Sequence, residues 1–162
     1  MQEEELLIGI SQLGIGFAGF ISIFMVFARR DGTFSAPDSI FVRAIIVSSF
    51  LIAAGALTPL VVAGFELSTP NIWRYSAISV LVISAVPTTN SVRKQVSLSS
   101  EDRAQIGTLF SILVWSLAAA IVVLYGLVAF GIGGGPLYIL SLALNIGLVM
   151  VTFATFALRR LL

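Results

Sequence analysis

A long segment without charge is the feature that most limits how this chain can fold. From Ala104 to Leu158 the sequence contains no Asp, Glu, Lys or Arg. Three earlier apolar stretches, each of about twenty residues, are also uncharged. A helix in water needs a solvated polar face, and these segments supply none. The sequence therefore predicts an all-α protein that crosses a membrane several times.

Composition narrows the chemistry open to the chain. Hydrophobic residues make up 58% and charged residues 10% of the sequence, whereas soluble proteins average about 25% charged residues. Histidine and cysteine are absent, which excludes disulfides, thiolate catalysis and Cys/His metal or haem sites. The net charge of +1 provides no basic field for nucleic acid. We expect no metal and no cofactor; a pigment or quinone would have to bind without histidine, through Phe residues, Trp115 or Tyr125.

Charges and helix start signals divide the chain into five predicted spans within a single transmembrane domain, residues 1–162. The spans cover about residues 6–28, 40–65, 73–90, 104–130 and 136–158. Acidic residues at positions 3–5 precede the first apolar run, whereas a secretory signal peptide has a basic flank and a shorter run. We therefore expect the first span to be retained. A four-span arrangement, with one run lying in the interface, is the alternative.

Capping signals mark the expected helix starts. Ser35 and Asp38 have the spacing of a capping box ahead of the second span. Thr69 is the expected N-cap of the third helix, with Pro70 at its first position. Ser99 begins a third capping signal, ahead of the fourth span. Pro136, after a glycine-rich reversal, is the expected start of the fifth.

Basic residues are distributed unequally between the two sides of a five-span bundle. One side receives Arg29, Arg30, Arg43, Arg93, Lys94, Arg103, Arg159 and Arg160, and the other receives Arg74 alone. Cytoplasmic loops of membrane proteins carry the excess of Lys and Arg. The pattern predicts an external N-terminus and a cytoplasmic C-terminus.

Ionisable residues are missing from the centres of the predicted spans. Intramembrane proton relays and catalytic pairs need such residues, so we expect no enzyme activity. The deepest strongly polar residue is Asn145, which we interpret mainly as a hydrogen-bonding partner for a neighbouring helix. The other interpretation is a polar pore lining formed by Asn145 with Ser48 and Ser84.

Small residues form a stripe along the first span, at Ser11, Gly14, Ala18 and Ser22. Such stripes let helix backbones approach closely in lipid. We favour packing inside the bundle as the explanation, with a seam toward another protein as the alternative.

Two prolines lie inside predicted spans, each in our interpretation near a helix end. Pro59 leaves the carbonyl of Gly55 without its helical donor, and Pro87 does the same to Ile83. Each proline could open a broken helix that binds a ligand, but a kink without a site is the simpler interpretation.

Glu66, Trp73 and Arg74 lie around the second external loop. They could form a recognition patch on the outer face. We favour an exposed ion pair between Glu66 and Arg74, with Trp73 in the aromatic belt at the membrane interface.

The first half of the chain contains a sequence pattern that resembles one found in other proteins. It comprises the segment from Ile10 to Phe20, then Arg29 to Gly32, then Asp38, Arg43 and Ala44, then Trp73 and Arg74. This pattern resembles one that recurs in small uncharacterised bacterial inner-membrane proteins of no assigned activity. The resemblance implies a multi-pass protein of the bacterial inner membrane and assigns no functional residues.

The sequence therefore favours a five-helix membrane bundle that acts as a non-catalytic structural or accessory subunit. Its expected partners are the lipid bilayer and either a second copy or a larger membrane complex. The alternative function is a homo-oligomeric pore or channel for ions or small uncharged solutes.

Overall fold

The computed structural model describes residues 2–28 and 35–161, which form six α-helices and no strand. The helices are α1 (Gln2–Ala28), α2 (Ala36–Ala63), α3 (Thr69–Val96), α4 (Ser100–Ile106), α5 (Thr108–Ala129) and α6 (Gly134–Leu161). All except α4 are long and apolar enough to cross a membrane, which gives 5 candidate spans in the described part of the chain. The prediction of an all-helical fold with several helices long and apolar enough to span a membrane is confirmed.

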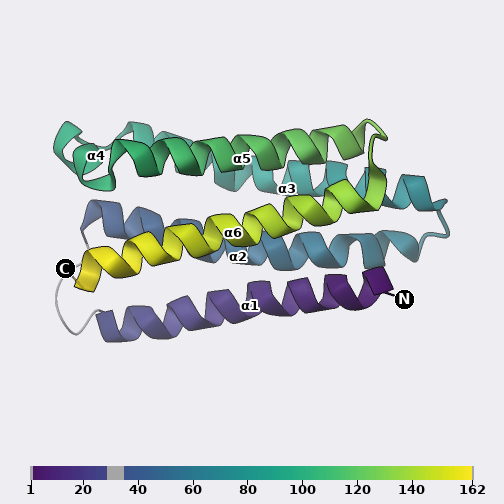
Figure 1. Cartoon of the computed structure of the whole chain (residues 1–162), viewed down its shortest axis with the longest axis horizontal. Coiled ribbons are helices and arrows are strands. Elements are labelled where there is room, and N and C mark those ends of the chain that lie inside the picture. The colour runs from purple at the N-terminus through teal and green to yellow at the C-terminus, as the bar shows by residue number, and fades with distance from the viewer. Residues whose placement is uncertain (1, 29–34, 162) are drawn as a thin grey trace.

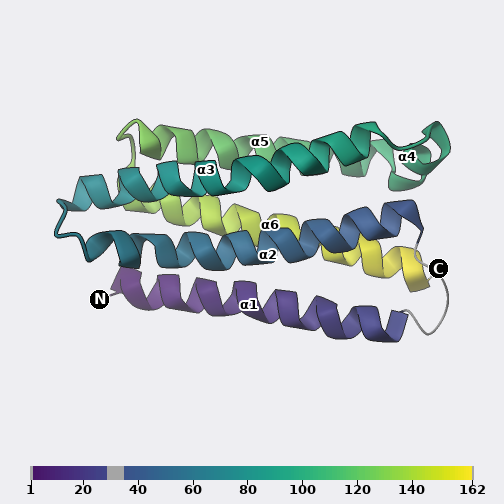
Figure 2. The ribbon, with the colours of Figure 1, turned by 180° about the vertical axis from the view of Figure 1, so that it is seen from behind.

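Four of the long helices form a bundle, and the fifth packs on its outside. Helices α2, α3, α5 and α6 contact one another in a ring, in that order, whereas α1 lies mainly against α2. Figures 1 and 2 show the five long helices running alternately in opposite directions, with the two chain ends at opposite ends of the molecule. The buried core fills the centre of the α2, α3, α5 and α6 ring and extends between α1 and α2, where Leu7, Ile10 and Ile21 are buried.

The charged residues gather at the ends of this bundle. The end that holds the C-terminus carries the start of α2, the end of α3, α4 and the end of α6, and with them Arg43, Arg93, Lys94, Arg103 and Arg159. The opposite end carries Arg74 and the acidic first turn of α1. Arg29 and Arg30, which are predicted to follow the first span, lie outside the described residues.

Two of the three predicted caps are confirmed. The Ser35 Oγ atom accepts from the Asp38 backbone N–H at 3.3 Å, and the Asp38 carboxylate accepts from the Ser35 N–H at 3.2 Å. Ser99 likewise accepts from the Asp102 N–H at 3.1 Å. The prediction that Thr69 is the cap of the third helix is wrong by one residue. Ser68 is the N-cap of α3, and its side chain makes no capping hydrogen bond.

The glycine-rich reversal ahead of α6 is present, but the helix begins earlier than predicted. It starts at Gly134 and not at Pro136. Gly131 and Gly133 have positive φ angles of 86° and 75°, which reverse the chain between α5 and α6. Pro136 is tolerated in the first turn because the N–H groups there have no acceptor within the helix.

Helix boundaries differ most from prediction around the polar segment between the third and fourth spans. Helix α3 continues to Val96 because Arg93 and Lys94 in its last turn interact favourably with the helix dipole. The predicted single helix from residue 104 is divided at Gly107, whose φ of 84° is accessible mainly to glycine. This break separates α4 from α5 and allows α4 to lie across the end of the bundle.

Candidate functional site

The charged side chains offer no evident reactive centre. Within the described residues, 2–28 and 35–161, no three or more His, Cys, Asp or Glu side chains are grouped so that they could hold a metal ion. The sequence itself contains neither His nor Cys. A candidate site must therefore be sought among the uncharged polar and aromatic groups of the bundle.

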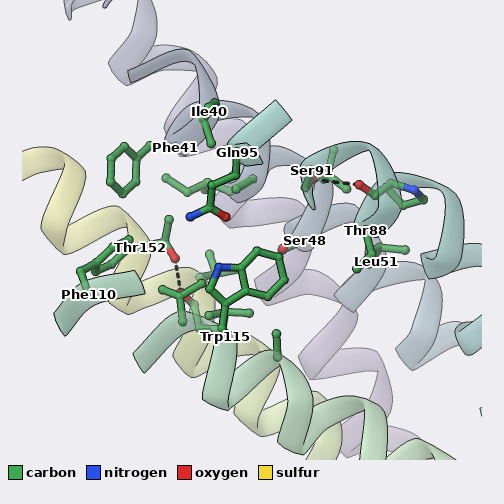
Figure 3. Close-up of a pocket in the computed structure, with 18 of the residues that line it drawn as sticks. Ile40, Phe41, Ser48, Leu51, Thr88, Ser91, Gln95, Phe110, Trp115 and Thr152 are labelled. Carbon is green, nitrogen blue, oxygen red and sulfur yellow. Dashed lines mark hydrogen bonds between the residues drawn. The ribbon is translucent and has the colours of Figure 1, made fainter. Parts of the chain in front are cut away.

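The ring of helices forms a partly open cavity of about 170 Å³ in the half of the bundle nearer the C-terminus. Its walls come from the first half of α2, the second half of α3, the first half of α5 and the second half of α6 (Figure 3). Ile106 of α4 also lines it and is 6% exposed. The lining side chains are Ile40, Phe41, Ala44, Ile45, Val47, Ser48, Leu51, Pro87, Thr88, Ser91, Gln95, Ile106, Phe110, Val114, Trp115, Ala118, Leu148, Val149 and Thr152.

The polar groups of the lining fall into two classes. Ser91 donates its hydroxyl hydrogen to the Pro87 carbonyl at 2.8 Å, and Thr152 donates to the Leu148 carbonyl at 2.7 Å. Ser48, Thr88, Gln95 and Trp115 make no side-chain hydrogen bond to the described residues. Figure 3 shows the Gln95 carboxamide beside the Trp115 indole, and both side chains line the cavity. The site therefore holds an amide and an indole N–H that the described protein leaves free.

An aromatic cluster fills the other half of the core. Tyr138 is 0% exposed, and its ring packs edge to face on Tyr125, with the ring centroids 5.2 Å apart. Trp73 packs on the same Tyr138 ring, with the centroids 5.5 Å apart. Buried aliphatic side chains, among them Ile52 and Leu142, lie between this cluster and the cavity along the helices. The cavity therefore ends within the bundle.

One predicted free carbonyl belongs to this cluster. Pro59 has no N–H for the Gly55 carbonyl, and the Tyr138 hydroxyl of α6 donates to that carbonyl at 2.7 Å. The helices α2 and α6 pack closely here, because a Cβ on Gly55 would lie 3.2 Å from Leu142 Cδ2. The freed carbonyl thus joins α2 to α6 and is occupied by the protein itself. Because the protein itself occupies this carbonyl, the structure favours a helix kink at Pro59 without a ligand site.

Pro87 lies in a different setting. The prediction places it near a helix end, but α3 continues to Val96, so Pro87 is interior to the helix. Pro87 also lines the cavity, together with Thr88 and Ser91. The helix is continuous here, but Pro87 removes one of its backbone hydrogen bonds. The cavity therefore forms where α3 is locally weakened.

Comparison with protein-family models, curated proteins and solved structures finds no match to this chain.

The predicted small-residue stripe of α1 lies against α2 within the same chain. Ser11, Gly14 and Ala18 are buried, and a Cβ on Gly14 would lie 2.7 Å from the Ser49 carbonyl oxygen. Real Cβ atoms do not approach a backbone atom this closely, so the α1 and α2 backbones are in direct contact at Gly14. Ser22 is exposed and donates to the Ala18 carbonyl at 2.7 Å. Three of the four stripe residues therefore serve intramolecular packing.

A second set of small residues lies on the outward face of α1. A Cβ added to Gly9, Gly16 or Gly19 would have no atom within 4 Å. Gln12 lies between them and is exposed. These four residues follow one another at spacings of three and four and share one helical face. We call them the outer α1 face.

The three candidate pore residues do not line one cavity. Ser48 lines the cavity described above, whereas Ser84 donates to the Leu81 carbonyl at 3.0 Å. Asn145 is half-buried on α6 and makes no side-chain hydrogen bond within the described chain. The structure therefore brings only Ser48 of the three to the candidate site.

The three candidate outer-face residues are not arranged as a patch. Trp73 is 8% exposed, and a Cβ on Gly135 would lie 2.9 Å from its ring. The Arg74 Nε–H donates to the Ala129 carbonyl at 2.9 Å and so satisfies the end of α5. Among the described residues Arg74 makes no ion pair with Glu66, which is exposed in the turn with φ of 56°. Trp73 belongs to the core instead of an interfacial belt.

The sequence did not identify Gln95 as a site residue. It indicated Trp115 only as a contact for a pigment or quinone. The predicted third span ends at about residue 90, which leaves Gln95 in a solvated loop. A helix that extends to Val96 brings it back to the bundle. The cue in the sequence was the pair Arg93 and Lys94, which is typical of a helix C-terminus.

Proposed function

We propose that this chain is a non-catalytic subunit of a membrane assembly, to which it binds through α1. The observation that carries this proposal is the uncovered outer α1 face, formed by Gly9, Gln12, Gly16 and Gly19. Uncovered glycines give lipid tails little to pack on, whereas they let the backbone of another helix approach closely. The position of α1 outside the four-helix ring leaves this face accessible (Figures 1 and 2).

Gln12 adds a polar group to the same face. It lies six residues beyond Leu6, or about 9 Å along the helix axis at 1.5 Å per residue. It is exposed and makes no hydrogen bond to the described residues. A carboxamide that faces lipid at this depth gains from a hydrogen bond to a neighbouring helix. Water at the membrane interface reaches the Gln12 carboxamide less readily than it reaches a polar side chain in the first turn of the helix.

The distribution of charge supports a non-catalytic role and an orientation. The charged side chains lie toward the ends of the bundle, so its centre holds no acid–base pair among the described residues. We assign the end with Arg93, Lys94 and Arg159 to the cytoplasm because of its excess of basic residues. The N-terminus is then external. The resemblance of the first half of the chain supports the bacterial inner membrane as the location.

The alternative function, a homo-oligomeric pore, receives less support from the fold. Tyr125, Tyr138 and Trp73 fill one half of the four-helix core. A conducting path would have to run between copies, and the helices that carry Ser48 and Asn145 would have to line it. We therefore rank the pore second.

The proposal is tested by purifying the tagged protein from its native membrane into nanodiscs, with quantitative mass spectrometry of the proteins that stay bound. The wild-type chain should retain a stoichiometric partner or form a defined homo-oligomer. Gly16→Leu should lose that association, because the new side chain covers the outer α1 face without touching the rest of the chain.

Two variants make the result specific to this face. Ser116→Leu adds bulk to an exposed position on α5 and should leave the association unchanged. Gln12→Leu removes the exposed amide and should weaken the association with the fold intact. A monomer without partners in the wild type, or equal partner recovery with Gly16→Leu, would overturn the proposal. Loss of association with Ser116→Leu alone would move the interface to α5.

A further inference from the structure

The cavity in the four-helix core has the dimensions of a small ligand site. Its volume of about 170 Å³ is comparable with that of an apolar protein cavity of about 150 Å³ that binds benzene. Most of its lining side chains are aliphatic or aromatic hydrocarbons, among them Leu51, Phe110 and Val149. A ring or a short branched chain would fit this space.

The free polar groups define what the ligand must carry. The Trp115 indole has a single N–H and can only donate, while the Gln95 carboxamide can donate and accept. Neither side chain has a hydrogen-bond partner in the described chain, and both face the cavity (Figure 3). Each group can therefore donate to an acceptor oxygen of a ligand in the cavity. A carbonyl oxygen, with two lone pairs, meets this requirement.

The walls favour a planar and uncharged molecule. Phe41 and Phe110 lie side by side, with their ring centroids 5.3 Å apart, and both line the cavity. Flat aromatic surfaces of this kind stack well against another ring. No Asp, Glu, Lys or Arg is among the described lining residues, so nothing in the wall offsets the desolvation of a charge. Arg159 lies over the Phe41 ring, 5.3 Å from its centroid, and is not part of the lining.

The cavity opens on the outer surface of the bundle. Trp115 is 37% exposed, and Thr88 is exposed as well. Both lie within helices of the membrane-spanning set, α5 and α3. A hydrophobic ligand can therefore reach the cavity from the bilayer.

We propose that this cavity binds a neutral planar ring that carries a carbonyl oxygen, of the quinone class, and that it takes this ligand from the membrane. Trp115 and Gln95 donate to the carbonyl, and Phe41 and Phe110 contact the ring. The proposal concerns binding alone. It stands independently of the assembly role of α1, because the two sites share no residue.

The test is calorimetric titration of the wild-type protein in nanodiscs with 1,4-naphthoquinone, after subtraction of the heat in empty nanodiscs. The chain contains no cysteine, so no thiol reacts with the quinone. Naphthalene has the same fused rings without the oxygens, and 2-naphthoate carries a negative charge. We expect saturable binding of 1,4-naphthoquinone, with an affinity roughly 5- to 10-fold higher than that of naphthalene, as one added hydrogen bond provides.

Variants locate the binding and identify the donors. Ala118→Phe fills the cavity and should abolish saturable binding, whereas Ala119→Phe adds the same ring at the next, exposed position and should not. Trp115→Phe keeps an aromatic ring without the N–H and should lower the affinity for 1,4-naphthoquinone roughly 5- to 10-fold. Trp115→Phe should leave the affinity for naphthalene unchanged. Gln95→Leu should also lower the affinity for 1,4-naphthoquinone.

Several results would overturn the proposal. Equal binding of 1,4-naphthoquinone and naphthalene, both insensitive to Trp115→Phe, would show that the ligand oxygen makes no use of the free donors. Tighter binding of 2-naphthoate would assign the site to an anion held by Arg159. Equal effects of Ala118→Phe and Ala119→Phe, or no saturable binding to the wild type, would remove the cavity as a quinone site.

Discussion

Removal of the Tyr138 hydroxyl should measure how the protein compensates for Pro59. In the native structure this hydroxyl donates to the Gly55 carbonyl at 2.7 Å, and Tyr138 is 0% exposed. Tyr138→Phe leaves the ring in place and deletes only the donor. The Gly55 carbonyl then lacks both its helical partner, which Pro59 removed, and its substitute.

The expected cost follows from the burial of that carbonyl. A hydrogen bond between helices in a membrane contributes about 0.6 kcal/mol on average and at most about 1.7 kcal/mol. A buried acceptor that is left without any donor costs about 1–3 kcal/mol. Gly55 is buried in the bundle, so we expect Tyr138→Phe to lower the free energy of unfolding by about 1–2 kcal/mol.

The neighbouring tyrosine provides a matched control. Tyr125 is 3% exposed, packs edge to face on Tyr138, and its hydroxyl has no hydrogen-bond partner in the described chain. Tyr125→Phe removes an unsatisfied buried polar atom. It should leave the free energy of unfolding unchanged or raise it slightly, by up to about 1 kcal/mol.

Unfolding can be measured by titration with dodecyl sulfate in mixed micelles, followed by tryptophan fluorescence and by circular dichroism. The decisive comparison is a double-mutant cycle with Pro59→Ala, which restores an N–H to the Gly55 carbonyl. In the Pro59→Ala background, Tyr138→Phe should cost about 1 kcal/mol less than in the wild type. An equal cost in the two backgrounds, or an equal cost for the two Tyr→Phe changes, would refute the reasoning.

Two further predictions concern packing and capping. Gly135→Ala should lower the free energy of unfolding by about 1–2 kcal/mol through overpacking, because its Cβ would lie 2.9 Å from Trp73 Cζ2; Gly147→Ala on the same helix meets nothing within 4 Å and should be neutral or stabilising in the same titration. Ser35→Ala should cost about 1 kcal/mol in that assay, because it removes the acceptor for the Asp38 N–H; Ser35→Thr should retain most of the stability, and an effect of Ser35→Ala as small as that of Ser35→Thr would argue against the cap.

Local signals account for the features that the sequence predicted correctly. The uncharged runs required helices in lipid because an unpaired backbone group there is costly. Ser35, Asp38 and Ser99 were recognisable as caps because a cap involves residues only three positions apart. Predicted helix boundaries were wrong where local signals conflicted. Helix α3 continues through a polar segment to Val96, whereas the helix is interrupted at Gly107 within a segment that the sequence predicts to be continuous.

The candidate site could not be predicted in the same way. Gln95 and Trp115 are twenty positions apart in the sequence and come from two helices whose rotation about their axes is set by packing. In membrane helices the apolar residues surround the whole circumference, so hydrophobic periodicity does not reveal which face is buried. The same reason hid the second small-residue face of α1.

The sequence by itself determined the class of this protein, its helical spans and the concentration of basic residues at one end. These properties follow from the solvation of single side chains and of the backbone, which depends on composition and local order. The tertiary structure alone decided that Gly14 contacts α2 while Gly16 stays uncovered, that Tyr138 replaces the donor missing at Pro59, and that four helices leave a cavity beside Trp115. These properties depend on how the helices are rotated and packed against one another. In a bilayer this choice is governed by close fit and by hydrogen bonds between helices, since the lipid is as apolar as the helices themselves.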